Sequence, residues 1–206
     1  MSRPRPTTVV FDLGAVLIDW DPRHLFREHF PDDPAGMERF LAEVCTPAWN
    51  HRQDEGRTWA EAVAELVGRH PHEEARIRAY ADRWPEMLGG PIAGTVAILE
   101  RLDAAGIPCY ALTNWSAETF PIARARYGFL GRFRGIVVSG DERVAKPDPA
   151  IYRILLERHA LAPETAVFID DRAENVAAAR ALGMDGILFT DPAALADALR
   201  SRGLPA

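Results

Sequence analysis

The sequence predicts an α/β fold: a doubly wound, Rossmann-like parallel sheet with an inserted helical cap. Five short apolar runs have the length and composition of strands that are buried on both faces. Helical patterns lie between or beside these runs, as expected when helices cover both faces of a sheet. One long stretch after the first run contains helical patterns alone, which indicates an insertion.

The predicted strands are rich in Val, Ile, Phe and Tyr, which favour extended backbone. They cover residues 8–14, 108–114, 135–140, 165–171 and 186–191. The predicted helices of the same part are amphipathic, and two end at a glycine, which commonly stops a helix. They cover residues 95–106, 116–128, 148–160 and 172–183.

The insertion covers residues 20–89 and contains no predicted strand. Its helical patterns lie at 22–30, 34–45, 58–70 and 73–88. We therefore divide the chain into a catalytic core, residues 1–19 and 90–206, and a helical cap, residues 20–89. A cap placed there would cover the carboxyl ends of the strands, where doubly wound folds bind ligands. Hinges are expected near 17–22 and 88–91.

The composition is that of an ordinary globular protein and does not indicate nucleic acid or an anionic membrane as a partner. The chain has 206 residues, 24 Lys plus Arg against 30 Asp plus Glu, and a net charge of −6. No basic stretch predicts nucleic-acid binding, and no apolar run approaches the ~20 residues of a membrane span. Cys45 and Cys109 have no metal-binding or redox spacing, which favours a reducing cytoplasm. Nothing in the sequence predicts an oligomeric state.

Polar residues follow three predicted strands at the points where the apolar runs end. Asp12 ends the first, Thr113 and Asn114 the second, and Asp170 with Asp171 the fourth. The carboxyl ends of parallel strands share one edge, so three carboxylates would converge there, which is costly without a cation.

Lys146, in a loop before a predicted helix, supplies one positive charge. Oxygen ligands without His or Cys suit Mg²⁺, which we expect as the cofactor. Taken singly, each residue has a structural alternative. Asp12 suits a turn, Thr113 could bind a backbone group, Lys146 could be a surface charge, and the two aspartates could cap a helix.

The strand-end motifs resemble those of the haloacid dehalogenase superfamily, and the similarity covers nearly the whole chain. The matching stretches, in order, are "VVFDLGAVL", "ALTNWS", "AKPDPAIY" and "VFIDDRAENVAAARALG". The helical insertion resembles the small cap class of that superfamily. The branch it resembles contains sugar 1-phosphate phosphatases and the phosphatase-like N-terminal domains of epoxide hydrolases.

The resemblance implies roles for individual residues. Asp12 matches the nucleophile that forms a covalent aspartyl intermediate. Thr113, with the backbone of Asn114, matches the group that binds a phosphoryl oxygen, and Lys146 matches the cation that balances Asp12 and the substrate.

The resemblance also implies a metal site. Asp171 matches the main metal ligand, joined by Asp12 and by the backbone carbonyl of Gly14. Asp170 and Asn175 match neighbouring positions of the metal shell, which are often reached through water.

Gly14 departs from the family pattern. Most phosphatases of the superfamily have an aspartate there, which protonates the leaving alcohol and then activates water. A phosphatase with a displaced acid, from Asp19 or Asp21, is one interpretation, although these residues also suit a hinge and a helix cap.

A 2-haloacid dehalogenase is the second interpretation, because a halide leaves without a proton. It does not account for Asp171, since dehalogenases need no metal. A non-catalytic phosphate-binding or regulatory protein is the third. A phosphatase acting on small phosphorylated metabolites explains the most residues.

The cap is expected to select the substrate, which is a small phosphorylated molecule or, in the alternative, a halogenated one. His51 and Arg52 are candidates for contacting polar groups of the substrate. Trp115, directly after the second motif, is a candidate for the floor of the pocket. Trp49 and Trp59 are interpreted as packing residues.

Overall fold

The computed structural model describes residues 4–206, and its centre is a five-stranded parallel sheet. The strand order is β5-β4-β1-β6-β7, so the chain winds outward on both sides of β1. This confirms the predicted doubly wound fold. Residues 1–3, with which the predicted core begins, lie outside the described part. The strands are β1 (Thr8–Phe11), β4 (Cys109–Thr113), β5 (Gly135–Val138), β6 (Ala166–Asp170) and β7 (Asp185–Leu188).

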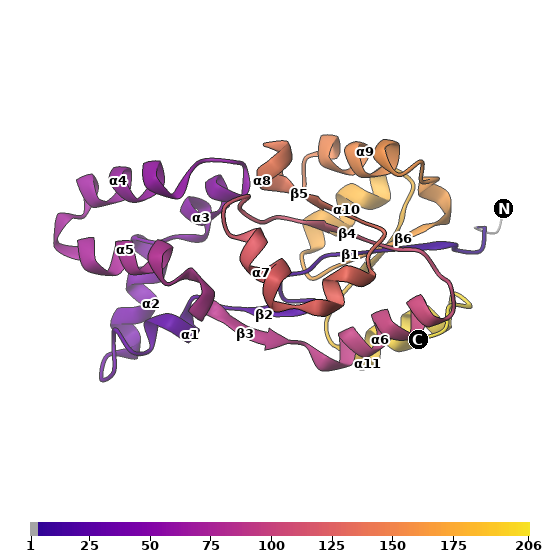
Figure 1. Ribbon diagram of the computed structural model, residues 1–206, viewed down its shortest axis with the longest axis horizontal. Helices are drawn as coiled ribbons and strands as arrows, with labels where there is room; N and C mark the ends of the chain where they lie inside the picture. The colour runs from indigo at the N-terminus through magenta and orange to yellow at the C-terminus, as the bar shows by residue number, and fades with distance from the viewer. Residues whose placement is uncertain (1–3) are drawn as a thin grey trace.

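Helices cover both faces of the sheet, with α9 and α10 on one side and α6 and α11 on the other (Figure 1). Alternate residues of the strands supply the two cores: Val10 and Phe168 pack with α9 and α10, whereas Val9 and Phe11 belong to the opposite cluster. The helices of this part are α6 (Ala93–Ala104), α7 (Phe120–Arg126), α8 (Ser139–Glu142), α9 (Pro149–Arg158), α10 (Ala173–Ala181) and α11 (Pro192–Arg200).

The first five helices form a separate helical segment beside the sheet, at the end away from both termini (Figure 1). The aromatic rings of Trp49, Trp59 and Tyr80 meet at its centre, with centroids 5.2–5.7 Å apart, and all three residues are buried. The two tryptophans are therefore packing residues, as predicted. The helices are α1 (Arg23–Phe26), α2 (Pro34–Glu43), α3 (Pro47–Asp54), α4 (Trp59–Arg69) and α5 (Glu74–Asp82).

The junction between this segment and the sheet differs from the prediction. No strand was expected within 20–89, but β2 (Ile18–Trp20) and β3 (Leu88–Pro91) form an antiparallel two-stranded ribbon. Both strands are too short for the alternating pattern by which strands are recognised in sequence. The positions expected to be hinges are thus paired backbone.

Local sequence explains where several helices begin. Thr58 and Glu61 form a capping box at the start of α4. Four other helices begin with a proline that directly follows a side-chain N-cap: Asp33, Thr46, Asp148 and Asp191 are the caps of α2, α3, α9 and α11. Of these, α3 and α11 are additional to the predicted helices.

Short 3₁₀ turns complete the chain, and both cysteines are buried as free thiols. No helix among residues 4–206 has the length and apolar character needed to cross a bilayer. The turns are η1 (Pro71–Glu73), η2 (Trp84–Met87), η3 (Gly128–Arg132) and η4 (Pro163–Thr165).

A close backbone approach beside the sheet gives a test of the fold. A Cβ atom at Gly140 would overlap the backbone nitrogen of Ala117 and lie 2.8 Å from the carbonyl oxygen of Trp115. We expect Gly140→Ala to lower the free energy of unfolding by about 1–3 kcal/mol, because the backbone must move apart. Gly68→Ala, in an exposed helical position with open space around it, should raise it by up to about 1 kcal/mol. Urea unfolding of both variants checks this, and equal effects would contradict the close approach of α8 to the loop that follows β4.

Candidate active site

The topology brings the predicted strand-end residues together. β1 lies between β4 and β6, and all three strands run in parallel. Asp12 directly follows β1, Thr113 ends β4 and Asp170 ends β6. The three side chains therefore come from adjacent strands at one edge of the sheet.

The ammonium group of Lys146 lies at the centre of this edge. Its Nζ is 2.9 Å from Asp12 Oδ1 and 2.7 Å from Asp170 Oδ2, and it donates to the carbonyl oxygen of Leu112 at 2.8 Å. The Lys146 side chain is completely buried. Burial by itself lowers the pKa of Lys146, but Asp12 and Asp170 outweigh it and raise the pKa above its usual value.

Asp12 is held in place, and its surroundings oppose its ionisation. Its Oδ1 accepts hydrogen bonds from the backbone N–H of Leu13, at 2.7 Å, and from Lys146. Burial raises the pKa of Asp12 to about 7, Lys146 opposes this shift, and Asp170 and Asp171 add to it. A further cation beside these carboxylates would therefore favour the ionised form of Asp12.

Asp170 is fixed from several sides. Asn175 Nδ2 donates to both of its oxygens, at 2.9 and 3.1 Å, and the backbone N–H of Arg172 donates to Oδ1 at 2.9 Å. With Lys146 on Oδ2, both oxygens are occupied by donors. Asp170 and Asn175 thus orient Lys146 at the edge of the sheet.

Three carboxylates at this edge have the arrangement of a metal site. Asp12, Asp170 and Asp171 each offer an oxygen, and these atoms lie within 4.8 Å of one another. Asp171 is the exposed member, and burial, followed by the charge of Asp170, raises its pKa. Gly14, predicted to contribute its carbonyl, lies on the wall of the same cavity. A donor set made of oxygen atoms fits Mg²⁺.

The second motif contains a hydroxyl group without a hydrogen-bond partner, on Thr113, and a side chain that fixes a neighbouring loop, on Asn114. The hydroxyl of Thr113 is buried and has no hydrogen-bond partner among residues 4–206. A buried hydroxyl without a partner is costly, so this group has an unused capacity for a hydrogen bond. The side chain of Asn114 accepts from the Lys146 backbone N–H at 2.8 Å and donates to its carbonyl oxygen at 2.9 Å. Asn114 thereby fixes the loop that carries Lys146.

A cavity of about 590 Å³ opens between the edge of the sheet and the helical segment. Its lining includes most of the site residues described above, though neither Thr113 nor Asp170, and side chains from α2, α3 and α5. Among the predicted site residues, the following line it: Asp12, Gly14, His51, Asn114, Lys146, Asp171 and Asn175.

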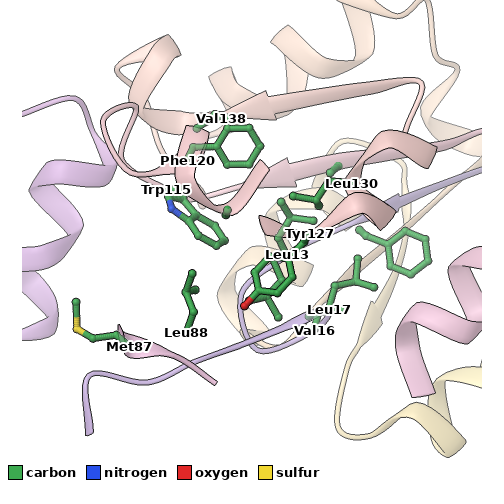
Figure 2. Close-up of a cluster of buried hydrophobic side chains, with 14 of the residues drawn as sticks. Leu13, Val16, Leu17, Met87, Leu88, Trp115, Phe120, Tyr127, Leu130 and Val138 are labelled. Carbon is green, nitrogen blue, oxygen red and sulfur yellow. The ribbon is translucent and has the colours of Figure 1, made fainter. Parts of the chain in front are cut away.

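Arg52 and Trp115 do not belong to this lining. Arg52 is exposed, and its guanidinium group lies 3.4 Å from Glu65. Trp115 is buried and packs against Trp84 and Phe120, with ring centroids 5.5 and 5.9 Å away. Figure 2 shows Trp115 inside this apolar cluster, so its indole ring stabilises the fold.

The two predicted substitutes for the missing acid also lie elsewhere. Asp19 is half-exposed on β2 and pairs with His24 at 3.0 Å. Asp21 accepts from the backbone N–H of Arg23 at 2.8 Å, which is the role of a residue at a helix start. Neither residue is among the described residues that line the cavity.

Two polar residues of α3 that the sequence did not single out for a role line the cavity: Asn50 and Asp54. They are four residues apart and therefore lie on the same face of the helix. This spacing was a signal in the sequence, but α3 itself was not predicted as a helix, so its faces could not be assigned.

A family model of haloacid dehalogenase-like hydrolases matches residues 6–183 of the chain. Among curated proteins, the sesquiterpene phosphatase astK of Aspergillus oryzae is 27% identical over 191 residues, which is 93% of each chain.

Solved structures share the fold. A HAD family enzyme from Bacteroides thetaiotaomicron, in complex with magnesium and inorganic phosphate, is 22% identical. The match has a TM-score of 0.67 and covers 90% of this chain and 95% of that chain. The L-2-haloacid dehalogenase of Xanthobacter autotrophicus, with chloropropionic acid covalently bound, is 20% identical with a TM-score of 0.62, covering 98% and 85%.

The buried ion cluster gives a test of the site's electrostatics. We expect Lys146→Met to lower the free energy of unfolding by about 3–5 kcal/mol at pH 8, because two buried carboxylates lose their counter-ion. Lys146 lowers the pKa of Asp12, so its removal raises that pKa further above the value in the unfolded chain. A carboxyl group whose pKa is higher in the folded than in the unfolded chain lowers the free energy of unfolding more as the pH rises. The loss of stability in Lys146→Met should therefore be smaller at pH 5 than at pH 8.

Urea unfolding at the two pH values measures this difference. Arg153→Met, which removes an exposed cation on α9, is the control and should change stability by no more than about 0.5 kcal/mol. A Lys146→Met deficit that is the same at pH 5 and pH 8 would contradict the assigned ion cluster.

Proposed function

Because the chain belongs to the haloacid dehalogenase-like hydrolase family, we propose that it is a Mg²⁺-dependent phosphatase of small phosphorylated metabolites. One observation carries the proposal: three carboxylates share a site with a single ammonium group. A divalent cation would balance the remaining negative charge, and a phosphoryl group, unlike a haloacid, carries enough charge to need one. The phosphatase relative from Aspergillus oryzae supports the same class of reaction.

In the proposed reaction Asp12 is the nucleophile. Its carboxylate oxygen forms a bond to phosphorus while the bond from phosphorus to the ester oxygen breaks, and the released alcohol takes up a proton. Water then attacks the aspartyl phosphate, releasing inorganic phosphate and restoring Asp12. The hydrogen bond from Leu13 holds the nucleophile in one orientation during both steps.

Lys146 and the second motif would bind the transferring group. The ammonium group lies within hydrogen-bond distance of Asp12, so it would also meet the negative charge of the oxygens on phosphorus. The unpartnered hydroxyl of Thr113 and the backbone N–H of Asn114 are the proposed donors to these oxygens. Donors fixed in this way stabilise charge that develops in the transition state.

The oxygen donor set supports Mg²⁺ as the proposed metal. Asp12, Asp171 and the carbonyl of Gly14 would hold Mg²⁺ directly, and Asp170 with Asn175 would complete its surroundings. When bound, the ion would neutralise phosphoryl charge and orient the phosphoryl group toward the nucleophile. The charge of Asp171, the exposed carboxylate, is then balanced by the ion.

The helical segment, residues 20–89, is the proposed cap, with residues 1–19 and 90–206 as the core. It contributes α2, α3 and α5 to the cavity wall, which is where the part of the substrate beyond phosphate would lie. His51, on α3, is the predicted substrate contact that lines this wall. Arg52 is not proposed to touch the substrate, because it pairs with Glu65 on the surface.

Gly14 is the observation that favours the alternative, a 2-haloacid dehalogenase. A halide leaves as an anion, so a site without a proton donor would serve it. Chloride release from 2-chloropropionate without Mg²⁺ would support the dehalogenase. Release of p-nitrophenol from p-nitrophenyl phosphate only with Mg²⁺ would support the phosphatase. Neither reaction in the purified protein would support a non-catalytic phosphate-binding role.

The nucleophile is tested by Asp12→Asn. The amide is a poor nucleophile of nearly the same shape, so we expect a folded protein without measurable turnover of p-nitrophenyl phosphate. Circular dichroism checks the fold, and steady-state kinetics with excess Mg²⁺ checks activity. Wild-type turnover in this variant would show that another residue attacks the substrate.

The metal site is tested by Asp171→Asn. Losing a direct ligand should raise the Mg²⁺ concentration for half-maximal activity by more than the about 10–100-fold typical of outer-shell changes. A Mg²⁺ titration of p-nitrophenyl phosphate turnover measures it. Asp197→Asn, an exposed aspartate on α11, is the matched control and should leave the titration unchanged. An unchanged titration in Asp171→Asn would overturn the assigned ligand.

A further inference from the structure

Asp54 places a further carboxyl group in the active-site cavity, from the helical segment rather than the sheet. It is the last residue of α3 and lines the same cavity as Asp12, Gly14 and Lys146. The charges of Asp12 and Lys146 both act on it. The two aspartates therefore approach the space for the substrate from different parts of the fold.

Contacts with the core fix the position of Asp54. Asn50 Nδ2, one turn earlier on α3, donates to Asp54 Oδ2 at 3.4 Å. The backbone N–H of Ser116, in the loop that follows Thr113 and Asn114, is near enough to lower the pKa of the Asp54 carboxyl group. Two residues later the chain approaches α8 so closely that a Cβ atom at Gly56 would lie 3.2 Å from the carbonyl oxygen of Gly140. The end of α3 is thus held beside the loop that is proposed to bind phosphate.

The surroundings of Asp54 favour its protonated form. Burial raises the pKa of Asp54 to about 8, and the neighbouring charges of Glu55 and Asp12 add to this, whereas Ser116 and Lys146 oppose it. The phenol of Tyr80, on α5, also lies within its electrostatic reach. A carboxylate at the carbonyl end of a helix is disfavoured as well. These influences all favour a carboxyl group that holds its proton at neutral pH.

The proposed phosphatase lacks a proton donor at the usual place. A Cβ atom at Gly14 would have no heavy atom within 4 Å, so the position where an acid would stand is open space. Without a donor, an alkoxide must leave as an anion, and general acid catalysis is typically worth about 10²–10⁴ in rate. The cavity thus has no carboxyl group at position 14 but has one on α3.

We propose that Asp54 is the general acid and base of this enzyme, an assignment that rests on the proposed phosphatase function. As the bond between phosphorus and the ester oxygen breaks, the Asp54 carboxyl gives its proton to that oxygen, and neutral alcohol leaves. The Asp54 carboxylate then takes a proton from the water that attacks the aspartyl phosphate. Both protons are accounted for, and Asp54 returns to its starting form.

A matched pair of substrates separates this role from a structural one. Phenyl phosphate and p-nitrophenyl phosphate have similar shapes, but phenolate is the poorer leaving group and depends more on protonation. In Asp54→Asn, kcat/KM, which reports the first step, should fall by about 10²-fold or more for phenyl phosphate and by less than about 10-fold for p-nitrophenyl phosphate. Equal decreases for the two esters would overturn the proposal, because lost packing or binding affects both alike.

Three further variants sharpen the test. Asp82→Asn makes the same exchange at an exposed position of α5 and should change neither value. Asp54→Glu retains a carboxyl group and should keep part of the activity towards phenyl phosphate. Gly14→Asp combined with Asp54→Asn places a carboxyl group in the open space beside Asp12 and should recover activity towards phenyl phosphate. If neither this double variant nor Asp54→Glu is more active towards phenyl phosphate than Asp54→Asn, Asp54 is not the proton donor.

The wild-type protein supplies a measurement that does not depend on how the variants fold. Asp54 must be protonated in the first step, so kcat/KM for phenyl phosphate should fall as the pH rises through about 8. The fall should be much weaker for p-nitrophenyl phosphate. Identical profiles for the two esters would overturn the proposal. A wild-type protein that hydrolyses neither ester with Mg²⁺ would instead overturn the phosphatase function and this assignment with it.

Discussion

The buried ammonium group of Lys146 is the interaction on which the other parts of the site rely. It binds Asp12, Asp170 and a backbone carbonyl oxygen at once, at the edge where three parallel strands end. Two buried carboxylates this close would repel each other and resist ionisation without it. Asn114 fixes the loop that carries Lys146, and Asn175 fixes its counter-ion Asp170. Polar groups from several separate parts of the chain thus position one charge. Lys146 lowers the pKa of Asp12 against the effect of burial, so the cluster favours ionisation of the proposed nucleophile.

The helical segment completes the cavity that the sheet begins. An antiparallel ribbon joins it to the sheet, and the end of α3 packs against the core. Its aromatic centre sets how α3 is oriented, which places Asn50 and Asp54 on the cavity wall and Arg52 at the surface. A segment held in this way can contribute chemistry as well as shape, because its polar groups have fixed positions relative to Asp12.

The proposed proton transfer from Asp54 depends on the same charges, those of Asp12 and Lys146. The charge of Asp12 raises the pKa of Asp54, while Lys146 lowers it, so the cluster around the proposed nucleophile also affects the proposed proton donor. A glycine at position 14 leaves space between the nucleophile and the helical segment. Gly14, which has no acidic side chain, and Asp54, which has one, thus line the same cavity.

The amino-acid sequence was sufficient to predict the five parallel strands, most of the helices around them and the residues at the strand ends. Buried strands are local apolar runs, and parallel strands necessarily share an edge, so Asp12, Thr113 and Asp170 could be brought together from the sequence. The side chains of the helical segment that face the cavity could not be predicted, because a helix face is chosen by packing against distant residues. The burial of Trp115, in the loop after β4, likewise depends on a partner distant in the sequence, Trp84, and the short β2–β3 ribbon exists only because its two strands meet in the folded chain.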